Sequence, residues 1–254
     1  MAISKAKIKF IRSLEQKKQR KELQLFVAEG PKLVDELMGY FDCVLLAATP
    51  DWLSLHNHYS ADEKIAINQQ ELKKISALRT PQQVVAVFKQ PQYSYEPNIL
   101  QKELCLALDS VQDPGNLGTI IRLADWFGIE HIFCSQETVD IFNTKTIQAS
   151  MGGLARVQVH YTDLKELIKQ NPDCPIYGTF LEGEDLYQKE LLQTGLIIMG
   201  NEGQGISPEL TPLVSEKLYI PNYPRNKESA ESLNVAIATA IVCAEFRRQA
   251  LPKH

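Results

Sequence analysis

The chain has 254 residues and a net charge of −4, with 44% hydrophobic and 23% charged residues, which is typical of a soluble globular protein long enough for two domains. Its five cysteines are scattered, without a C-x-x-C pair or a nearby histidine, so we expect no metal, no disulfide framework and a reducing cytoplasm. It has neither an apolar stretch of the secretory kind nor a run of roughly 20 apolar residues, so we expect no signal peptide and no membrane partner.

The first 21 residues hold eight basic side chains and one acidic side chain, Glu15. Such a run can bind RNA phosphates by releasing counterions, but charge alone is better explained by a solvated helix face. RNA binding becomes the stronger interpretation only if the rest of the chain also points to RNA. The basic residues are Lys5, Lys7, Lys9, Arg12, Lys17, Lys18, Arg20 and Lys21.

Residues 1–90 are predicted to form a small α/β domain. Helices are expected over residues 8–21, from Pro31 to Met38 and near Gln70–Leu78, and Pro31 suits the first turn of its helix. Short apolar or alternating runs predict strands at Leu25–Ala28, Cys43–Ala48, Lys64–Ile67 and Val84–Phe88.

Residues 91–102 are expected to be a linker, because the stretch Lys89–Gln101 (KQPQYSYEPNILQ) holds two prolines, mostly polar side chains and no sustained period. From residue 103 to 254, strands alternate with helices, which predicts a mostly parallel sheet with helices on both faces. The expected strands are Leu104–Leu108, His131–Cys134, Val157–His160, Ile176–Phe180, Leu196–Met199 and Leu218–Ile220. The expected helices are Leu117–Phe127, Lys145–Ser150, Asp163–Gln170 and Pro208–Ser215. Ligands of such sheets bind at the carboxyl ends of the strands.

The first motif at such an end follows Leu104–Leu108 and reads DSVQDPGNLGTIIR. Asn116 stands where a helix N-cap is expected after the Pro-Gly turn, and Arg122 lies among apolar residues near the first turns of the helix. Taken singly, both are better explained as structural, the one as a cap and the other as an arginine extending to water.

The second motif follows Leu196–Met199 and reads GNEGQGISP. Its three glycines would let the backbone approach a ligand closely. The order G-x-x-G-x-G is the reverse of the dinucleotide fingerprint and no lysine follows, so the motif does not predict a nucleotide-phosphate loop. Glu202 is unusual in a plain turn, whereas Ser207 could simply cap a helix that begins at Pro208.

The third motif joins Tyr219-Ile220-Pro221 to the sequence SAESLNVAIA, which starts at Ser229. Apolar residues recur at helical spacing from Leu233 onward, which predicts a last helix with Ser232 and Asn234 at its start. Small residues on one face of this helix would allow close packing. Each feature alone also has a structural explanation.

Together and in this order, the three motifs resemble the SpoU/TrmH family of RNA ribose 2′-O-methyltransferases, within the SPOUT superfamily. The matching signatures are N-x-G-x-x-x-R at Asn116–Arg122, G-N-E-G-x-G-I-S at Gly200–Ser207 and I-P…E-S-L-N-V at Ile220–Val235. The FVAEG stretch at Phe26–Gly30 resembles the RNA substrate-binding domain often fused to these enzymes. The resemblance implies a trefoil-knotted C-terminal domain, S-adenosylmethionine as methyl donor, a homodimer, and an RNA substrate that is ribosomal rather than transfer RNA.

The resemblance also implies roles for individual residues. Arg122 would act on the ribose hydroxyl, and Glu202 would pair with that arginine or another basic group. Because the pKa of free arginine is above 12, orienting the hydroxyl and stabilising charge is physically safer than a role as base. The implied catalytic residues are Asn116, Arg122, Glu202, Ser232 and Asn234. The implied donor pocket is Thr179, Leu181, Gly200, Asn201, Gly205, Ile220 and Leu233, and the implied RNA-binding residues are Lys17, Lys18, Arg20 and Lys21.

The segment Asn222–Ala230 departs from the family, because it is nine residues long, lacks glycine and contains Pro224, Arg225 and Lys227. Its contacts with the donor therefore cannot be assigned by alignment, and its added positive charges would also suit RNA. Three alternatives stay open: a transfer-RNA ribose methyltransferase, a knotted RNA-binding or assembly protein without methyl transfer, and an enzyme of this fold that methylates a base nitrogen.

Overall fold

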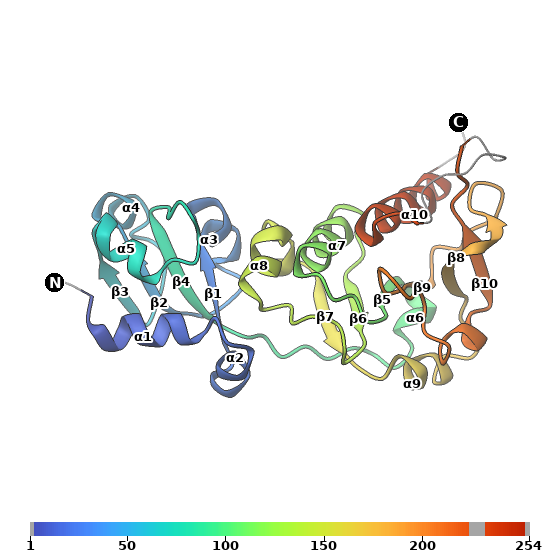
Figure 1. Ribbon diagram of the computed structural model, residues 1–254, viewed down its shortest axis with the longest axis horizontal. Helices are drawn as coiled ribbons and strands as arrows, with labels where there is room; N and C mark the ends of the chain where they lie inside the picture. Colours follow the sequence, from blue (N-terminus) through green and yellow to red (C-terminus); the bar gives the residue numbers. More distant parts are fainter. Residues whose placement is uncertain (1–2, 224–231, 252–254) are drawn as a thin grey trace. The chain divides into compact units, whose positions relative to one another are not determined.

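The computed structural model describes residues 3–223 and 232–251 (Figure 1). The chain divides into two compact units, each built from two stretches of sequence. The first unit is Met1–Gln92 with Asp140–Ala155, and the second is Tyr93–Val139 with Arg156–His254. The first unit thus includes a segment that lies well beyond the expected linker in the sequence. No helix of the described residues is long and apolar enough to cross a membrane.

The first unit contains a four-stranded mixed sheet in the order β1-β4-β2-β3. Strand β4 is antiparallel to both of its neighbours, and β2 and β3 are parallel. The strands are β1 (Leu25–Glu29), β2 (Cys43–Ala48), β3 (Glu63–Ala66) and β4 (Val84–Lys89). Strand β4 is buried at every position except its last, because it lies between two strands and is covered on both faces.

Helices surround this sheet: α1 (Lys5–Ser13), α2 (Lys17–Leu23), α3 (Pro31–Leu37), α4 (Pro50–Leu55), α5 (Gln69–Ile75), α8 (Thr144–Ser150) and the 3₁₀ turn η1 (Gly153–Ala155). The single helix expected over residues 8–21 is in fact two helices. The first ends where the buried Leu14 donates its N–H to the carbonyl of Ile11, and the chain then turns before Lys17. Helix α5 begins with a capping box formed by Asn68 and Glu71.

The segment Asp140–Ala155 is held in the first unit by polar and aromatic contacts. Arg20 donates two hydrogen bonds to Oδ2 of Asp140, at 2.6 and 2.9 Å. The ring of Phe142 stacks on that of Phe26, with the centroids 5.0 Å apart. A long-range ion pair and a stacked ring together explain why this segment packs with residues so distant in sequence.

The second unit contains a six-stranded parallel sheet in the order β10-β8-β9-β5-β6-β7, which confirms the predicted α/β class and the parallel sheet. The strands are β5 (Leu104–Leu108), β6 (His131–Cys134), β7 (Gln158–Tyr161), β8 (Ile176–Asp185), β9 (Gly195–Met199) and β10 (Glu216–Tyr219). The central strands β5 and β9 are buried at every residue, as expected of strands covered on both faces.

The second unit's helices are α6 (Ile99–Lys102), α7 (Pro114–Trp126), α9 (Leu164–Lys169), α10 (Val235–Ala250) and the 3₁₀ turn η2 (Thr211–Leu213). The helix expected over Pro208–Ser215 is wrong, because only η2 forms there. Pro212 has no N–H to donate to the carbonyl of Pro208, so an α-helical turn cannot continue through it. Helix α6 lies inside the expected linker, and its Ile99 and Leu100 are buried in the core of this unit.

Candidate active site

The first motif follows β5 and forms the start of α7. Asp113 is the N-cap of this helix, and its carboxylate accepts the N–H of Asn116 at 2.9 Å. Pro114 occupies the first turn, where a missing N–H costs nothing. The expectation that Asn116 is the cap is therefore wrong. Because Asp113 performs this task, the side chain of Asn116 is left for other contacts.

Asn116 joins all three motifs through its side chain. Its amide nitrogen donates to Oε1 of Glu202 in the second motif, at 2.9 Å. Its amide oxygen accepts from the amide nitrogen of Asn234 in the third motif, at 3.0 Å. Donor and acceptor of one amide are thus both used, which fixes its orientation. Asn116 thus joins segments that lie 86 and 118 residues away from it in the sequence.

Arg122 is exposed on α7, about two helical turns after the Pro114-Gly115 sequence that begins the helix. Within the described part of the chain it has no hydrogen bond or ion pair, and Glu202 contacts Asn116 rather than Arg122. The pairing of Glu202 with Arg122 is therefore not seen in this structure. An unpaired, exposed guanidinium is suited to a phosphate or a ribose oxygen.

The loop of the second motif folds tightly on itself. Asn201 and Gly205 exchange backbone hydrogen bonds at 2.9 Å, and Oδ1 of Asn201 accepts the N–H groups of Gly203 and Gln204. A Cβ atom at Gly200 would lie 2.2 Å from the backbone carbon of Gly205. The glycine at position 200 is thus required by the loop's own backbone.

A buried carboxylate connects the first two motifs. Asp109, the first residue after β5, is 5% exposed and accepts the N–H of Ser207 at 2.7 Å. Beside it, the carbonyl of Ser110 accepts from the amide nitrogen of Asn201 at 2.8 Å. Sequence reasoning missed Asp109, although an acidic residue directly after a fully apolar strand was the available signal. These two links hold the loop of the second motif against the end of β5.

The third motif is described only in part. Asn234 is the N-cap of α10, and its Oδ1 accepts the N–H groups of Ala236 and Ile237. Ser232 is exposed and lies two residues before this cap. Pro224, Arg225 and Lys227 of the long loop lie outside the described residues. The side chain of Asn234 therefore serves both the helix and the contact with Asn116.

The residues expected to bind the donor lie on or after three adjacent strands, except for one that precedes α10. Thr179 and Leu181 belong to β8, Gly200, Asn201 and Gly205 follow β9, Ile220 follows β10, and Leu233 precedes α10. Thr179, Gly200, Asn201 and Ile220 are half-buried. The remaining three, Leu181, Gly205 and Leu233, are exposed, the leucines by 70% and 49%. Strands β8 and β10 pair with a register shift that leaves residues 179–183 out of the ladder. The carboxyl ends of these strands thus present half-buried and exposed apolar side chains next to a segment of β8 that is out of the ladder with β10.

The outer strands are also joined by charge. Lys189 donates to the carboxylates of Glu184 on β8 and Glu216 on β10, at 2.9 and 2.7 Å. These hydrogen bonds raise the pKa of Lys189 above its usual range. The bridge ties the two strands together near the register shift.

The basic helix α2 has two different sides. Lys17, Lys18 and Lys21 are exposed. Arg20 is only 3% exposed, and besides its ion pair with Asp140 it donates to the carbonyls of Leu14 and Glu15. The expectation that Arg20 binds RNA is therefore corrected, because its guanidinium is already satisfied inside the first unit.

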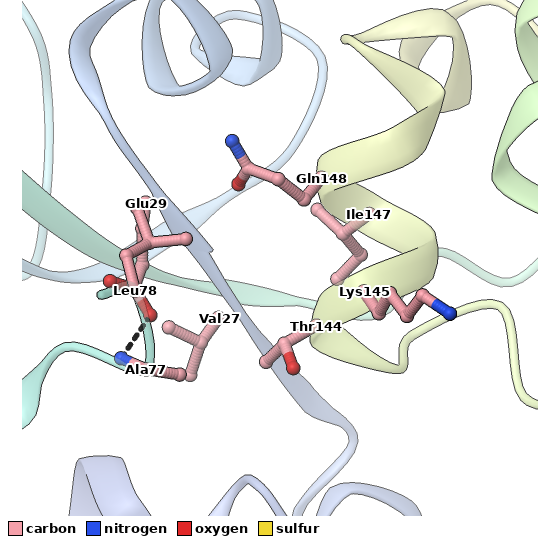
Figure 2. A pocket seen from close by; sticks show the side chains of 8 residues that line it. All are labelled: Val27, Glu29, Ala77, Leu78, Thr144, Lys145, Ile147 and Gln148. Carbon is pink, nitrogen blue, oxygen red and sulfur yellow. Dashed lines mark hydrogen bonds between the residues drawn. The ribbon is translucent and has the colours of Figure 1, made fainter. Parts of the chain in front are cut away.

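A pocket of about 220 Å³ lies in the first unit (Figure 2). It is lined by Val27, Glu29, Ala77, Leu78, Thr144, Lys145, Ile147 and Gln148. The Glu29 carboxylate is already satisfied, since it accepts the N–H of Ala77 at 2.9 Å, drawn dashed in Figure 2, and the hydroxyl of Ser76. None of the lining residues belongs to the three motifs, so this pocket is separate from the candidate active site.

A parallel sheet with a polar network at its carboxyl edge, next to half-buried apolar strand ends, defines an α/β enzyme that binds a small organic cosubstrate there. Residues 103–244 match the SpoU rRNA Methylase family, and residues 5–86 match the MRM3-like substrate binding domain. The chain belongs to the SpoU rRNA Methylase family.

Similar proteins cover nearly the whole chain. The Bacillus subtilis 23S rRNA (guanosine(2553)-2′-O)-methyltransferase RlmP is 31% identical over 95% of this chain and 96% of its own length. A Porphyromonas gingivalis structure assigned to the TrmH family is 41% identical, with a TM-score of 0.88, and covers 97% of this chain and 99% of that one. An AdoMet-bound rRNA methyltransferase from Sinorhizobium meliloti is 32% identical, with a TM-score of 0.84, and covers 99% of both chains.

Proposed function

We propose that this protein transfers a methyl group from S-adenosylmethionine to a ribose 2′-hydroxyl of RNA, with ribosomal RNA as substrate. The observation that carries the proposal is the hydrogen-bonded network of Asn116, Glu202 and Asn234, which joins the three motifs at one edge of the sheet. Relatives of the same family that span both units, such as RlmP, are named for this reaction on 23S rRNA.

The chemistry asks for orientation of a poor nucleophile. A ribose hydroxyl must lose its proton as it attacks, and the sulfonium donor supplies an activated methyl group. Arg122 is exposed and without a protein partner among the described residues, so it is available to orient the hydroxyl and to neutralise developing negative charge. Asn116 holds the second and third motifs together, and we propose that Ser232 belongs to the same polar group.

The donor fits the edge formed by β8, β9 and β10. The apolar side chains of Leu181, Ile220 and Leu233 would cover the adenosyl group, while the backbone at Gly200 would offer hydrogen-bonding groups. Thr179, Asn201 and Gly205 complete the set. We further propose that the three strands and α10 form the trefoil knot of the family, a proposal supported by the order β10-β8-β9.

The RNA is proposed to bind in part through Lys17, Lys18 and Lys21, whose exposed ammonium groups suit phosphates. We also propose that the protein is a homodimer in the cytoplasm. Helices α7 and α10 pack together and carry exposed apolar side chains, Trp126 at 82% and Ile237 at 53%. A monomeric wild-type protein in sedimentation equilibrium would contradict the dimer.

The reaction is tested with purified protein, labelled S-adenosylmethionine and whole-cell RNA, followed by nuclease digestion and mass spectrometry. A 2′-O-methylated nucleotide in ribosomal RNA is expected. A methylated base would refute the reaction type, a product only in transfer RNA would refute the substrate, and RNA binding without donor binding would favour a non-catalytic protein.

The role of Arg122 is tested by Arg122→Ala. We expect donor binding to be retained, as measured by calorimetry, and turnover to fall by about 100-fold or more, since an oriented charged donor typically contributes 10²–10³ in rate. The control is Arg248→Ala, another exposed arginine of the second unit, which among the described residues pairs with the buried Glu245. Its turnover is compared at a temperature where this variant is folded. Full turnover in Arg122→Ala would remove this residue from the mechanism.

A further inference from the structure

A second polar cluster lies at the amino ends of the strands of the six-stranded sheet, opposite to the ends that carry the active site. Glu103 directly precedes β5, Glu130 directly precedes β6, and His131 is the first residue of β6. Strands β5 and β6 are neighbours and parallel, so their amino ends lie side by side. The three motifs of the active site follow the carboxyl ends, so this cluster is separate from them.

The donor atoms of this cluster converge. One carboxylate oxygen of Glu103, one of Glu130 and a ring nitrogen of His131 all lie within 4.8 Å of one another. Nε2 of His131 is 3.9 Å from Oε2 of Glu103, which is too long for a hydrogen bond. The histidine side chain is 9% exposed, so its ring nitrogen faces the carboxylates rather than open solvent.

The other ring nitrogen of His131 already has a partner. Nδ1 of His131 lies 3.1 Å from Nε2 of His160 on β7. His160 is itself buried and packs against the rings of Tyr95 and Phe133, with centroids 5.0 and 5.2 Å away. A histidine whose Nδ1 is held by a buried partner has its ring orientation fixed, which is the usual arrangement around a metal-binding imidazole.

We propose that Glu103, Glu130 and His131 form a binding site for a divalent cation of the zinc type, with His160 orienting the ligand histidine. One nitrogen and two carboxylate oxygens are a donor set that Zn²⁺ accepts, with water as the fourth ligand. Two donors on a tetrahedral zinc lie about 3.4 Å apart, so the 3.9 Å between His131 and Glu103 must shorten by about half an ångström. The pairs that include Glu130 lie within 4.8 Å and must shorten by at most about 1.4 Å. The half-exposed Glu103 and the exposed Glu130 have room for that shift.

The expected role is structural. The ion would join the segments that lead into β5 and β6, and His160 would extend the link to β7. It would also neutralise two carboxylates that face one imidazole. The cysteines do not take part, so this site is compatible with their scattered spacing.

The test is equilibrium titration of the chelator-treated full-length protein with Zn²⁺ against a chromogenic competitor, together with Co²⁺ absorption as a geometric probe. We expect one ion per chain, a higher Tm on adding Zn²⁺, and visible Co²⁺ bands of a four- or five-coordinate site. His131→Phe keeps an aromatic ring beside His160 and should abolish binding. Glu103→Gln should weaken it strongly, and His160→Phe by about 10-fold, as for partners of metal-bound histidines.

The matched control is His56→Gln. His56 also faces a carboxylate, Asp35 at 3.6 Å, and also has its Nδ1 occupied, by the carbonyl of Trp52. Among the described residues, however, it belongs to no group of three side chains that could hold a metal ion. This variant should bind Zn²⁺ like the wild type. The proposal is overturned if the wild type binds no ion at micromolar Zn²⁺, if His131→Phe binds as well as the wild type, or if His56→Gln alone loses the ion.

Discussion

The buried ion pair between Arg20 and Asp140 separates two explanations of the basic N-terminal run. Arg20 is 3% exposed and the Asp140 side chain 15%, and four hydrogen bonds from the guanidinium reach Asp140 and the carbonyls of Leu14 and Glu15. In Arg20→Ala, the Asp140 carboxylate keeps its charge but loses this partner, and two carbonyls lose a donor.

Breaking a buried pair from one side costs about 3–5 kcal/mol, and the slight exposure of Asp140 places the expected loss near about 3 kcal/mol. At about 2 °C or more per kcal/mol for a chain of this size, Tm should fall by about 6 °C or more. The matched control is Lys89→Ala, whose partner Asp42 is 79% exposed, and here the loss should stay below about 1 kcal/mol.

The Tm of each variant is measured together with its affinity for RNA. The triple variant Lys17→Ala, Lys18→Ala, Lys21→Ala should keep its Tm, bind RNA more weakly, and reduce the slope of log affinity against log salt by up to about 2 for single-stranded RNA. Arg20→Ala should show the reverse pattern at temperatures where it is folded. An unchanged Tm in Arg20→Ala, combined with a loss of RNA affinity equal to that of the lysine variant, would refute the structural role of Arg20.

Three further predictions concern the loops and the core. Gly200→Ala should lower the affinity for S-adenosylmethionine by about 10-fold or more, because the added Cβ would collide with the Gly205 backbone. In the control Gly203→Ala, the atom nearest to the added Cβ is 3.7 Å away, so this variant should bind normally. Equal affinities of the two variants in calorimetry would contradict this prediction. Asp109→Ala should lower the free energy of unfolding by about 2 kcal/mol, because the N–H of Ser207 loses its acceptor. In Asp109→Asn the amide oxygen can still accept this N–H, so the free energy of unfolding should fall less. Urea unfolding of both variants tests whether the alanine variant is the less stable. Burial raises the pKa of Cys43 to about 11 and that of Cys105 to about 12, so at pH 8 native protein should resist iodoacetamide until it unfolds.

Much of the fold could be predicted from the sequence because its strands are continuous apolar runs. Cys43–Ala48, His131–Cys134 and Leu104–Leu108 were expected with the bounds that the structure has. A run of this kind is buried wherever it pairs, so its extent depends on local residues alone. The helix over Pro208–Ser215 was wrong because a proline inside the pattern outweighed a plausible cap.

The contacts within the candidate site could not be read from the sequence. The resemblance of the three motifs to the family named Asn116, Glu202 and Asn234 together, yet the sequence could not show that Asn116 links the other two. Asp113 and Asn116 are both good N-caps three residues apart, and only the geometry decides between them. Arg20 was misjudged for a similar reason, because its partner lies 120 residues away.

The composite first unit has a practical consequence for dissecting the molecule. A fragment that stops at residue 92 would lack Asp140–Ala155, so Arg20 would lose its carboxylate and Phe26 would lose a stacked ring. A second-half fragment would in turn carry that segment without the residues it packs on. The two halves of the sequence therefore cannot be exchanged between proteins as independent cassettes. Transplanting the first unit requires grafting residues 140–155 with it.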